Sequence, residues 1–139
     1  MRIEATVQIR RSPEDVWAFV VDHGNDERWC KKVESVEQAG ERRWIVTHKP
    51  VPFRPPMILS LEHLAADPPR FLKLREEDDA SVFVVTYRLE AAEQGTRFTQ
   101  ITEFDRKKLP SVLHRTFARG VRRDVQRQLR DLRRVLEAQ

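Results

Sequence analysis

The sequence of 139 residues contains a single cysteine, Cys30, which excludes an intrachain disulfide and disfavours a cysteine-based metal site. It also contains no apolar run approaching the roughly 18 residues that are needed to cross a bilayer. Residues 1–6 include an early acid and lack the apolar core of a signal peptide, which disfavours secretion. We therefore expect a protein of the reducing cytoplasm without stable membrane insertion.

Motifs that carry chemistry are also missing. The chain has no glycine-rich phosphate loop, no nucleophile elbow and no Ser/His/Asp arrangement. Its histidines are scattered, and none has the His-x3-His spacing of a helical zinc site. They are His23, His48, His63 and His114. We therefore expect no metal and no cofactor, and the sequence identifies no catalytic residue.

The composition is that of a soluble globular protein, with 40% hydrophobic and 35% charged residues. The length fits one domain, residues 1–139, around a single core. Lys and Arg number 26 against 22 Asp and Glu, and most of the surplus arginine lies near the C-terminus. Nucleic acid is therefore a partner to consider, but a solvated arginine face gives the same charge, and we expect no nucleic-acid binding.

The N-terminal region predicts a strand followed by two short helices. Residues 2–10 alternate apolar and polar side chains, as expected of a half-buried strand. The Ser-Pro-Glu-Asp sequence at 12–15 predicts a capped helix start. Gly24 and Asn25 end this helix, and residues 26–31 leave room for only about two further turns.

Six further strands are predicted from apolar and alternating runs that are separated by turn signals. Short links between sequential strands imply an antiparallel meander. The six ranges are 33–38, 43–49, 57–64, 71–76, 82–91 and 97–105.

The last segment, 110–138, predicts one long amphipathic helix. At about 100° per residue, seven apolar side chains fall in one arc of about 160°, and eight arginines fall in the opposite arc. The apolar residues are Leu113, Phe117, Val121, Val125, Leu129, Leu132 and Leu136. A single antiparallel sheet covered by one long helix makes the predicted fold class α+β, with two layers.

Four segments occur in an order that carries a family resemblance. They are "SPEDVWAFVVD" (12–22), the Arg28-Trp29 pair, "DPPRFLKLR" (67–75) and "VTYRLEAAEQGTRFTQITEF" (85–104). In this order they resemble the first helix, the second short helix, a Pro-Pro-Arg strand entry and the paired last strands of the START-like helix-grip superfamily. That superfamily includes START domains, birch-pollen-allergen-like proteins and polyketide cyclases/dehydrases. The resemblance implies a curved, seven-stranded antiparallel sheet around the long C-terminal helix, with two short helices after strand one.

The resemblance also implies a cavity between the sheet and the long helix. The leading hypothesis is that this cavity binds a hydrophobic or amphipathic small molecule, such as a lipid, a polyketide or an isoprenoid. The first alternative is an enzyme of the polyketide cyclase/dehydrase type that uses the same cavity. The second is a module that binds a partner through the arginine face. The oligomeric state, monomer or homodimer, is left open.

Candidate ligand contacts lie on the inward faces of the strands and on the apolar arc of the helix. The polar tips of Tyr87 and Gln100 need a partner if they face inward. A histidine there is suited to proton transfer at neutral pH, although His114 could equally be a satisfied core residue. For the apolar candidates, ordinary core packing is the competing interpretation. The full set is His114, Tyr87, Gln100, His48, Phe83, Phe98, Phe117, Met57 and Leu113.

Other conspicuous residues are expected to be structural. Trp17, Trp29 and Cys30 are expected to pack in the core. Phe53 and Arg54 lie on a proline-rich link, where they form either a lid over the cavity or an exposed loop held by its prolines.

Overall fold

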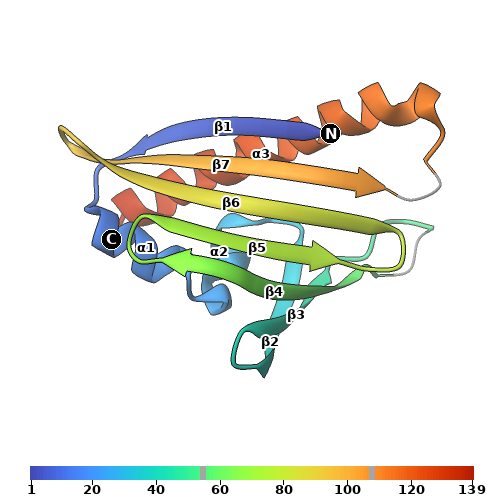
Figure 1. Cartoon of the computed structure of the whole chain (residues 1–139), viewed down its shortest axis with the longest axis horizontal. Helices are drawn as coiled ribbons and strands as arrows, with labels where there is room; N and C mark the ends of the chain where they lie inside the picture. The colour runs from blue at the N-terminus through green and yellow to red at the C-terminus, as the bar shows by residue number, and fades with distance from the viewer. Residues whose placement is uncertain (54–55, 107–108) are drawn as a thin grey trace.

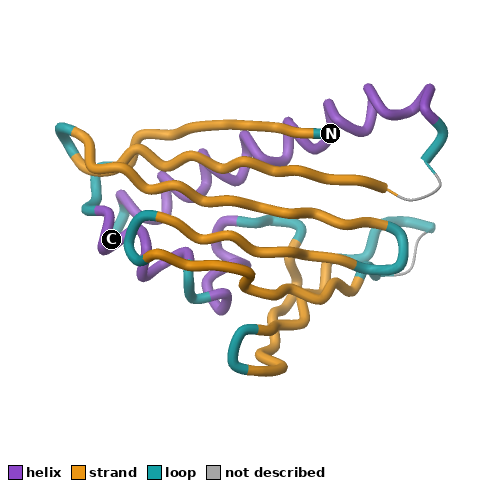
Figure 2. The backbone as a smooth tube through the Cα atoms, viewed as in Figure 1, coloured by secondary structure: helices purple, strands orange, loops and turns teal. Residues whose placement is uncertain are grey.

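The computed structural model describes residues 1–53, 56–106 and 109–139 as one antiparallel sheet crossed by a long helix (Figure 1; Figure 2). The strands are β1 (Arg2–Ile9), β2 (Val33–Gly40), β3 (Arg43–His48), β4 (Ile58–Asp67), β5 (Phe71–Glu77), β6 (Ser81–Ala92) and β7 (Gly95–Arg106). The helices are α1 (Pro13–Val20), α2 (Asp26–Trp29) and α3 (His114–Glu137), with 3-10 turns η1 (His23–Asn25) and η2 (Ser111–Leu113).

The seven strands form one sheet in the order β1-β7-β6-β5-β4-β3-β2. Every neighbouring pair is antiparallel, and β2 to β7 form a meander of consecutive hairpins. The predicted α+β helix-grip fold, with seven strands and a long C-terminal helix, is therefore confirmed. β4 continues to Asp67, beyond the predicted end at residue 64, because a register shift after His63 allows pairing with β5 to resume.

The break in the N-terminal helix has a local cause. The Ser12 hydroxyl accepts a hydrogen bond from the Asp15 amide at 3.2 Å, which caps the start of α1. The Asp22 carboxylate accepts one from the Gly24 amide at 3.0 Å, and this stabilises η1 as a separate turn. The chain then forms the short α2, which ends at Trp29, a side chain only 1% exposed. The prediction of two short helices is thus confirmed.

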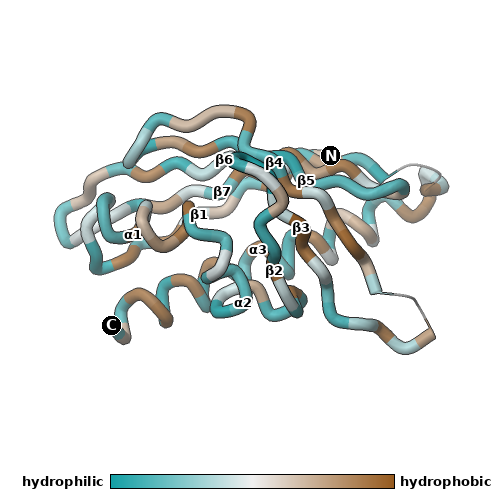
Figure 3. The backbone as a smooth tube through the Cα atoms, turned by 90° about the horizontal axis from the view of Figure 1, so that it is seen from below, coloured by the Kyte–Doolittle hydropathy of each residue, from teal (hydrophilic) through white to brown (hydrophobic). Residues whose placement is uncertain are grey.

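The long helix α3 is buried over only its C-terminal half. Val125, Leu129, Leu132 and Leu136 are all buried, and α3 packs against β1 and α2. The first turns lie beyond the N-terminal end of β1 in Figure 1, and Leu113 is 47% exposed. The apolar and polar stretches that alternate along α3 in Figure 3 reflect its amphipathic sequence. All eight arginines of this helix are exposed.

At the first residue of β7, Gly95, the backbone geometry requires a glycine. Its φ of 150° is rarely adopted by residues with side chains. A Cβ added there would lie 2.1 Å from the Ile9 carbonyl oxygen and 2.8 Å from the Arg11 amide nitrogen. Both are backbone atoms, so the clash cannot be relieved by a side-chain rotation.

Replacing Gly95 with Ala is therefore expected to lower the free energy of unfolding by about 3 kcal/mol or more, measured by urea denaturation. Gly40→Ala is the matched control, because an added Cβ there lies 3.6 Å from its nearest neighbour and φ is not positive. We expect the control to change stability by about 0.5 kcal/mol or less. Equal losses for the two variants would contradict this explanation.

Candidate functional site

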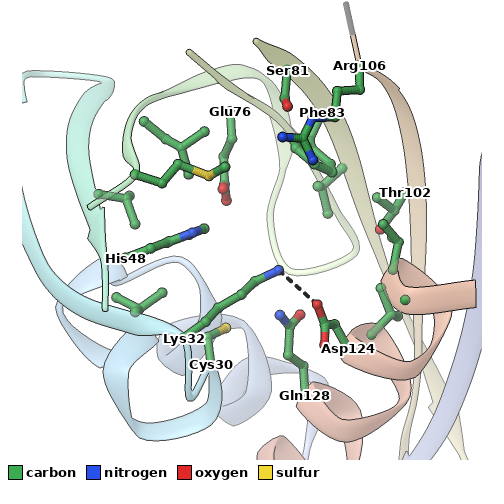
Figure 4. A pocket seen from close by; sticks show the side chains of 18 of the residues that line it. Cys30, Lys32, His48, Glu76, Ser81, Phe83, Thr102, Arg106, Asp124 and Gln128 are labelled. Carbon is green, nitrogen blue, oxygen red and sulfur yellow. Dashed lines mark hydrogen bonds and ion pairs between the residues drawn. The ribbon is translucent and has the colours of Figure 1, made fainter. Parts of the chain in front are cut away.

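A partly open cavity of about 610 Å³ lies between the inner face of the sheet and the N-terminal half of α3 (Figure 4). The segment between α2 and β2, together with the end of β3, closes another side. The cavity exists because this half of the helix does not fill the space in front of the sheet. At Gly120 an added Cβ would meet no described atom within 4 Å apart from its own turn of the helix, and Thr116 is also short. The C-terminal half of α3 instead presents leucines, which close the core.

Most of the cavity wall is apolar. Met57 and Leu59 near the start of β4, Phe83 and Val85 on β6, and Phe117 on α3 all line it. The aromatic rings continue behind the wall, with the Phe83 and Phe104 centroids 5.9 Å apart and those of Phe104 and Phe117 5.5 Å apart. A packed aromatic wall of this kind is preformed and does not need to be ordered by a ligand.

Glu76 is the most unusual polar group of the wall. It lies on β5, and Figure 4 shows its carboxylate directed into the cavity. No hydrogen bond or ion pair to this carboxylate is found among the described residues. Burial raises the pKa of Glu76 to about 7, and the nearby charge of Asp26 contributes to the same rise. The group is therefore close to half protonated at neutral pH.

His48 enters the cavity from the end of β3, where its backbone amide donates to the Met57 carbonyl at 2.8 Å. Burial lowers its side-chain pKa to about 4, and the charge of Lys32 contributes to the same lowering. The imidazole is therefore neutral at pH 7 and offers one donor and one acceptor.

An ion pair joins the two sides of the cavity. The Lys32 ammonium lies 3.4 Å from the Asp124 carboxylate of α3 (Figure 4). These side chains are 47% and 42% exposed, so the pair is screened by solvent and contributes little to stability. It can open without much cost when a molecule enters.

Tyr87 and Gln100 are cross-strand partners on β6 and β7, and both line the cavity. The Gln100 amide donates to the Thr102 hydroxyl at 3.2 Å. Its Oε1 atom is buried and has no donor among the described residues. Burial raises the pKa of Tyr87 well above its usual value, so the phenol keeps its proton. As predicted for an inward-facing glutamine, Gln100 Oε1 therefore still needs a hydrogen-bond donor.

The structure brings seven of the nine predicted contacts to the cavity wall. They are Tyr87, Gln100, His48, Phe83, Phe117, Met57 and Leu113. Their position as ligand contacts stays a prediction, since no ligand is bound. The Cys30 thiol also lines the cavity, and burial raises its pKa well above the usual value, which makes it unreactive.

His114 and Phe98 are not brought to the cavity. His114 is exposed, and its Nε2 lies 3.2 Å from the Leu109 carbonyl oxygen. The His114 side chain faces solvent at the start of α3, although Thr116 and Phe117 of the same turn line the cavity. Phe98 is fully buried in the core, with its ring centroid 5.2 Å from that of Tyr87. Neither placement supports contact with a ligand in this cavity.

The proposed lid is only partly described. Phe53 is fully exposed, with a φ of 67°, and makes no lid in this conformation. Arg54 lies outside the described residues.

The sequence reasoning missed Glu76, although a signal was present. Leu72, Leu74 and Glu76 share one face of β5, and the first two are completely buried. An acid that continues a buried apolar alternation marks a carboxyl on the inner face. Lys32 and Asp124 carried no such signal, because each lies in an ordinary charged stretch.

A second cluster links η1 to β4 and was also missed. The His23 Nδ1 lies 3.0 Å from the Asp26 carboxylate, and its Nε2 lies 2.6 Å from Nε2 of His63. The Trp44 ring packs against both imidazoles, with centroid distances of 4.7 and 4.5 Å. Only one proton fits between the two facing nitrogens, which disfavours charging both rings at once. No set of three metal-ligating side chains is found within the described ranges.

Glu76 makes stability depend on pH. Between the unfolded-state pKa of 4.5 and the folded-state pKa of about 7, the native protein binds more protons than the unfolded chain. Stability therefore falls as pH rises through this window. Glu76→Gln is expected to stabilise the protein by about 1–3 kcal/mol at about pH 8, and to have little effect at about pH 5.

The measurement is urea denaturation of both proteins at the two pH values. Glu77→Gln is the matched control, because Glu77 is outside the cavity wall and its carboxylate lies 3.6 Å from Arg75. An effect of Glu76→Gln that is the same at both pH values would contradict the assignment.

Comparisons with known proteins agree with this architecture. The CV1439 protein of Chromobacterium violaceum superposes with a TM-score of 0.80 at 15% identity, covering 98% of this chain and 97% of that one. The TTHA0849 protein of Thermus thermophilus superposes with a TM-score of 0.79 at 18% identity, covering 99% and 98%. The Zhui aromatase/cyclase of a Streptomyces species superposes with a TM-score of 0.78 at 14% identity, covering 99% and 93%. At these identities the likeness shows a shared fold.

No protein with a curated description matches the sequence. Within the described part of the chain, no helix is both long enough and apolar enough to span a membrane. The family model described as polyketide cyclase/dehydrase and lipid transport matches residues 1–137, which is nearly the whole sequence. The chain therefore belongs to the polyketide cyclase/dehydrase and lipid transport family.

Proposed function

We propose that this protein binds a hydrophobic or amphipathic small molecule in the cavity between the sheet and α3. The observation that carries the proposal is the cavity itself, about 610 Å³ in volume, whose wall combines apolar and aromatic side chains with polar and charged ones. Sites for small organic ligands have this size and composition. The family description, which includes lipid transport, supports the same class of ligand.

The polar groups give the bound molecule an orientation. An apolar body would pack on Met57, Phe83 and Phe117, which line the cavity from three different parts of the fold. A polar substituent would pair with Gln100 Oε1, whose burial without a donor is otherwise costly. Opening of the exposed Lys32–Asp124 pair would admit the ligand at little cost.

A second candidate function is catalysis of the cyclase/dehydrase type, which one observation favours. Glu76 has a pKa of about 7 and faces the cavity, so it can both accept and donate a proton at neutral pH. The neutral His48 in the same wall can hydrogen-bond a substrate. These two residues replace His114 as the candidates for proton transfer. Turnover that survives Glu76→Gln would count against this second function.

A ligand panel with a blocked-cavity variant tests the binding proposal. Fatty acids, aromatic polyketides and isoprenoids are added to the wild-type protein, and the melting temperature is measured. A ligand at about 100 times its Kd stabilises the native state by about 2.7 kcal/mol, so at least one class is expected to raise the melting temperature by several degrees.

Gly120→Leu is expected to abolish that shift, because its side chain would occupy the empty space in front of Gly120. Arg119→Leu is the matched control, since Arg119 is exposed on the same helix and is not part of the wall. It should keep the shift. No shift with any class, or an unchanged shift in Gly120→Leu, would overturn the proposal.

A further inference from the structure

We infer that the ligand of this cavity is a hydrophobic amine, with an ammonium group bound by the carboxylate of Glu76. The inference rests on the proposed function and specifies the chemical class of its ligand.

The first support is the position of Glu76. Its side chain continues the inward face of β5 after the buried Leu72 and Leu74, so the strand fixes its direction. The carboxylate therefore enters the cavity, as Figure 4 shows, where Met57, Phe83 and Val85 are among the lining side chains. A carboxylate in such a place is costly unless a positive group or hydrogen-bond donors accompany it.

The second support is that neither cation of the described wall lies within ion-pairing distance of Glu76 in this conformation. Lys32 pairs with Asp124 at 3.4 Å. The Arg106 guanidinium lies over the Phe117 ring, 5.4 Å from its centroid. Across the described residues, neither comes within ion-pairing distance of Glu76. Within residues 1–53, 56–106 and 109–139, the Glu76 carboxylate thus faces the cavity without a counter-ion from the protein.

The third support is the charge balance of the wall. The described wall contains three acids, Asp26, Glu76 and Asp124, against two cationic side chains, Lys32 and Arg106. His48 faces the same space but is neutral at pH 7, and Asp26 is paired with His23. When ionised, Glu76 is therefore the one acid of the described wall whose charge has no partner within ion-pairing distance. A monocation neutralises it, whereas a carboxylate ligand would add a second one.

The shape of the cavity supplies the rest of the recognition. Met57, Phe83 and Val85 lie in the wall with Glu76 and offer apolar contact to an alkyl or aromatic body. An ammonium group at one end of that body would donate to the carboxylate. Because the site is partly desolvated, this charge-assisted hydrogen bond is stronger than the same contact in water.

Isothermal titration calorimetry with three probes of equal chain length tests the inference. The probes are decylamine, decanol and decanoate, each used below its micelle concentration. We expect decylamine to bind most tightly to the wild-type protein at about pH 8. Glu76→Gln should weaken decylamine binding by about 10-fold or more and leave decanol binding unchanged.

Glu77→Gln is the control on the same strand, because it makes the same chemical change outside the cavity wall. It should leave all three affinities unchanged. This control separates a specific counter-ion from a general effect of removing one negative charge.

The pH dependence gives a second readout that does not depend on a variant. Decylamine stays charged over the range used, whereas Glu76 loses its proton around pH 7. The affinity of the protein for decylamine should therefore rise up to about 100-fold between about pH 5 and about pH 8, in proportion to the ionised fraction of Glu76. Decanol affinity should not change over that range, and Glu76→Gln should remove the rise for decylamine.

The outcomes separate this inference from the proposed function. If decanol or decanoate binds and decylamine does not bind more tightly, the inference is overturned while the proposed function stands. The inference is also overturned, and the proposed function stands, if decylamine binds Glu76→Gln as tightly as it binds the wild-type protein. If none of the three probes binds, both are overturned.

Discussion

The structure depends on one constraint, which is that a single long helix must cover the inner face of a seven-stranded sheet. The C-terminal half of α3 meets this constraint with Val125, Leu129, Leu132 and Leu136, all of which are buried. The N-terminal half does not, because its first turns extend past the N-terminal end of β1 and it carries Gly120 where a large side chain would be needed. The uncovered part of the sheet becomes the cavity, so the buried core at one end and the cavity at the other follow from the same helix.

The electrostatic properties of the site follow from the same geometry. Glu76 and His48 lose much of their water because the residues of the cavity wall surround them. Burial therefore raises the pKa of Glu76 and lowers that of His48. At pH 7 the His48 imidazole is therefore neutral, and the Glu76 carboxyl is close to half protonated. A cavity containing such groups suits a polar ligand group better than a purely hydrocarbon ligand.

The fold could be predicted from the sequence because its signals are local. Strand alternation, the Ser12 cap and the amphipathic stripe of α3 each depend on residues within one element. The site could be predicted only in part. Periodicity gives the direction of a side chain but not how far the opposing layer extends, which is why the helical phase points to His114 as a cavity residue although it lies in solvent. The His23–His63 contact joins residues 40 positions apart, and no local sequence pattern predicts it.

The central claim is that Glu76 faces the uncovered part of the sheet without a partner among the described residues. Carbon-13 NMR of glutamate-labelled protein, with Glu76→Gln used to assign the resonance, measures its titration directly. The account predicts that the Glu76 carboxyl titrates with a pKa of about 7, and that a bound amine lowers this pKa. Titration near 4.5, the ordinary value for a glutamate, would show that the carboxyl is solvated or paired and would contradict the account.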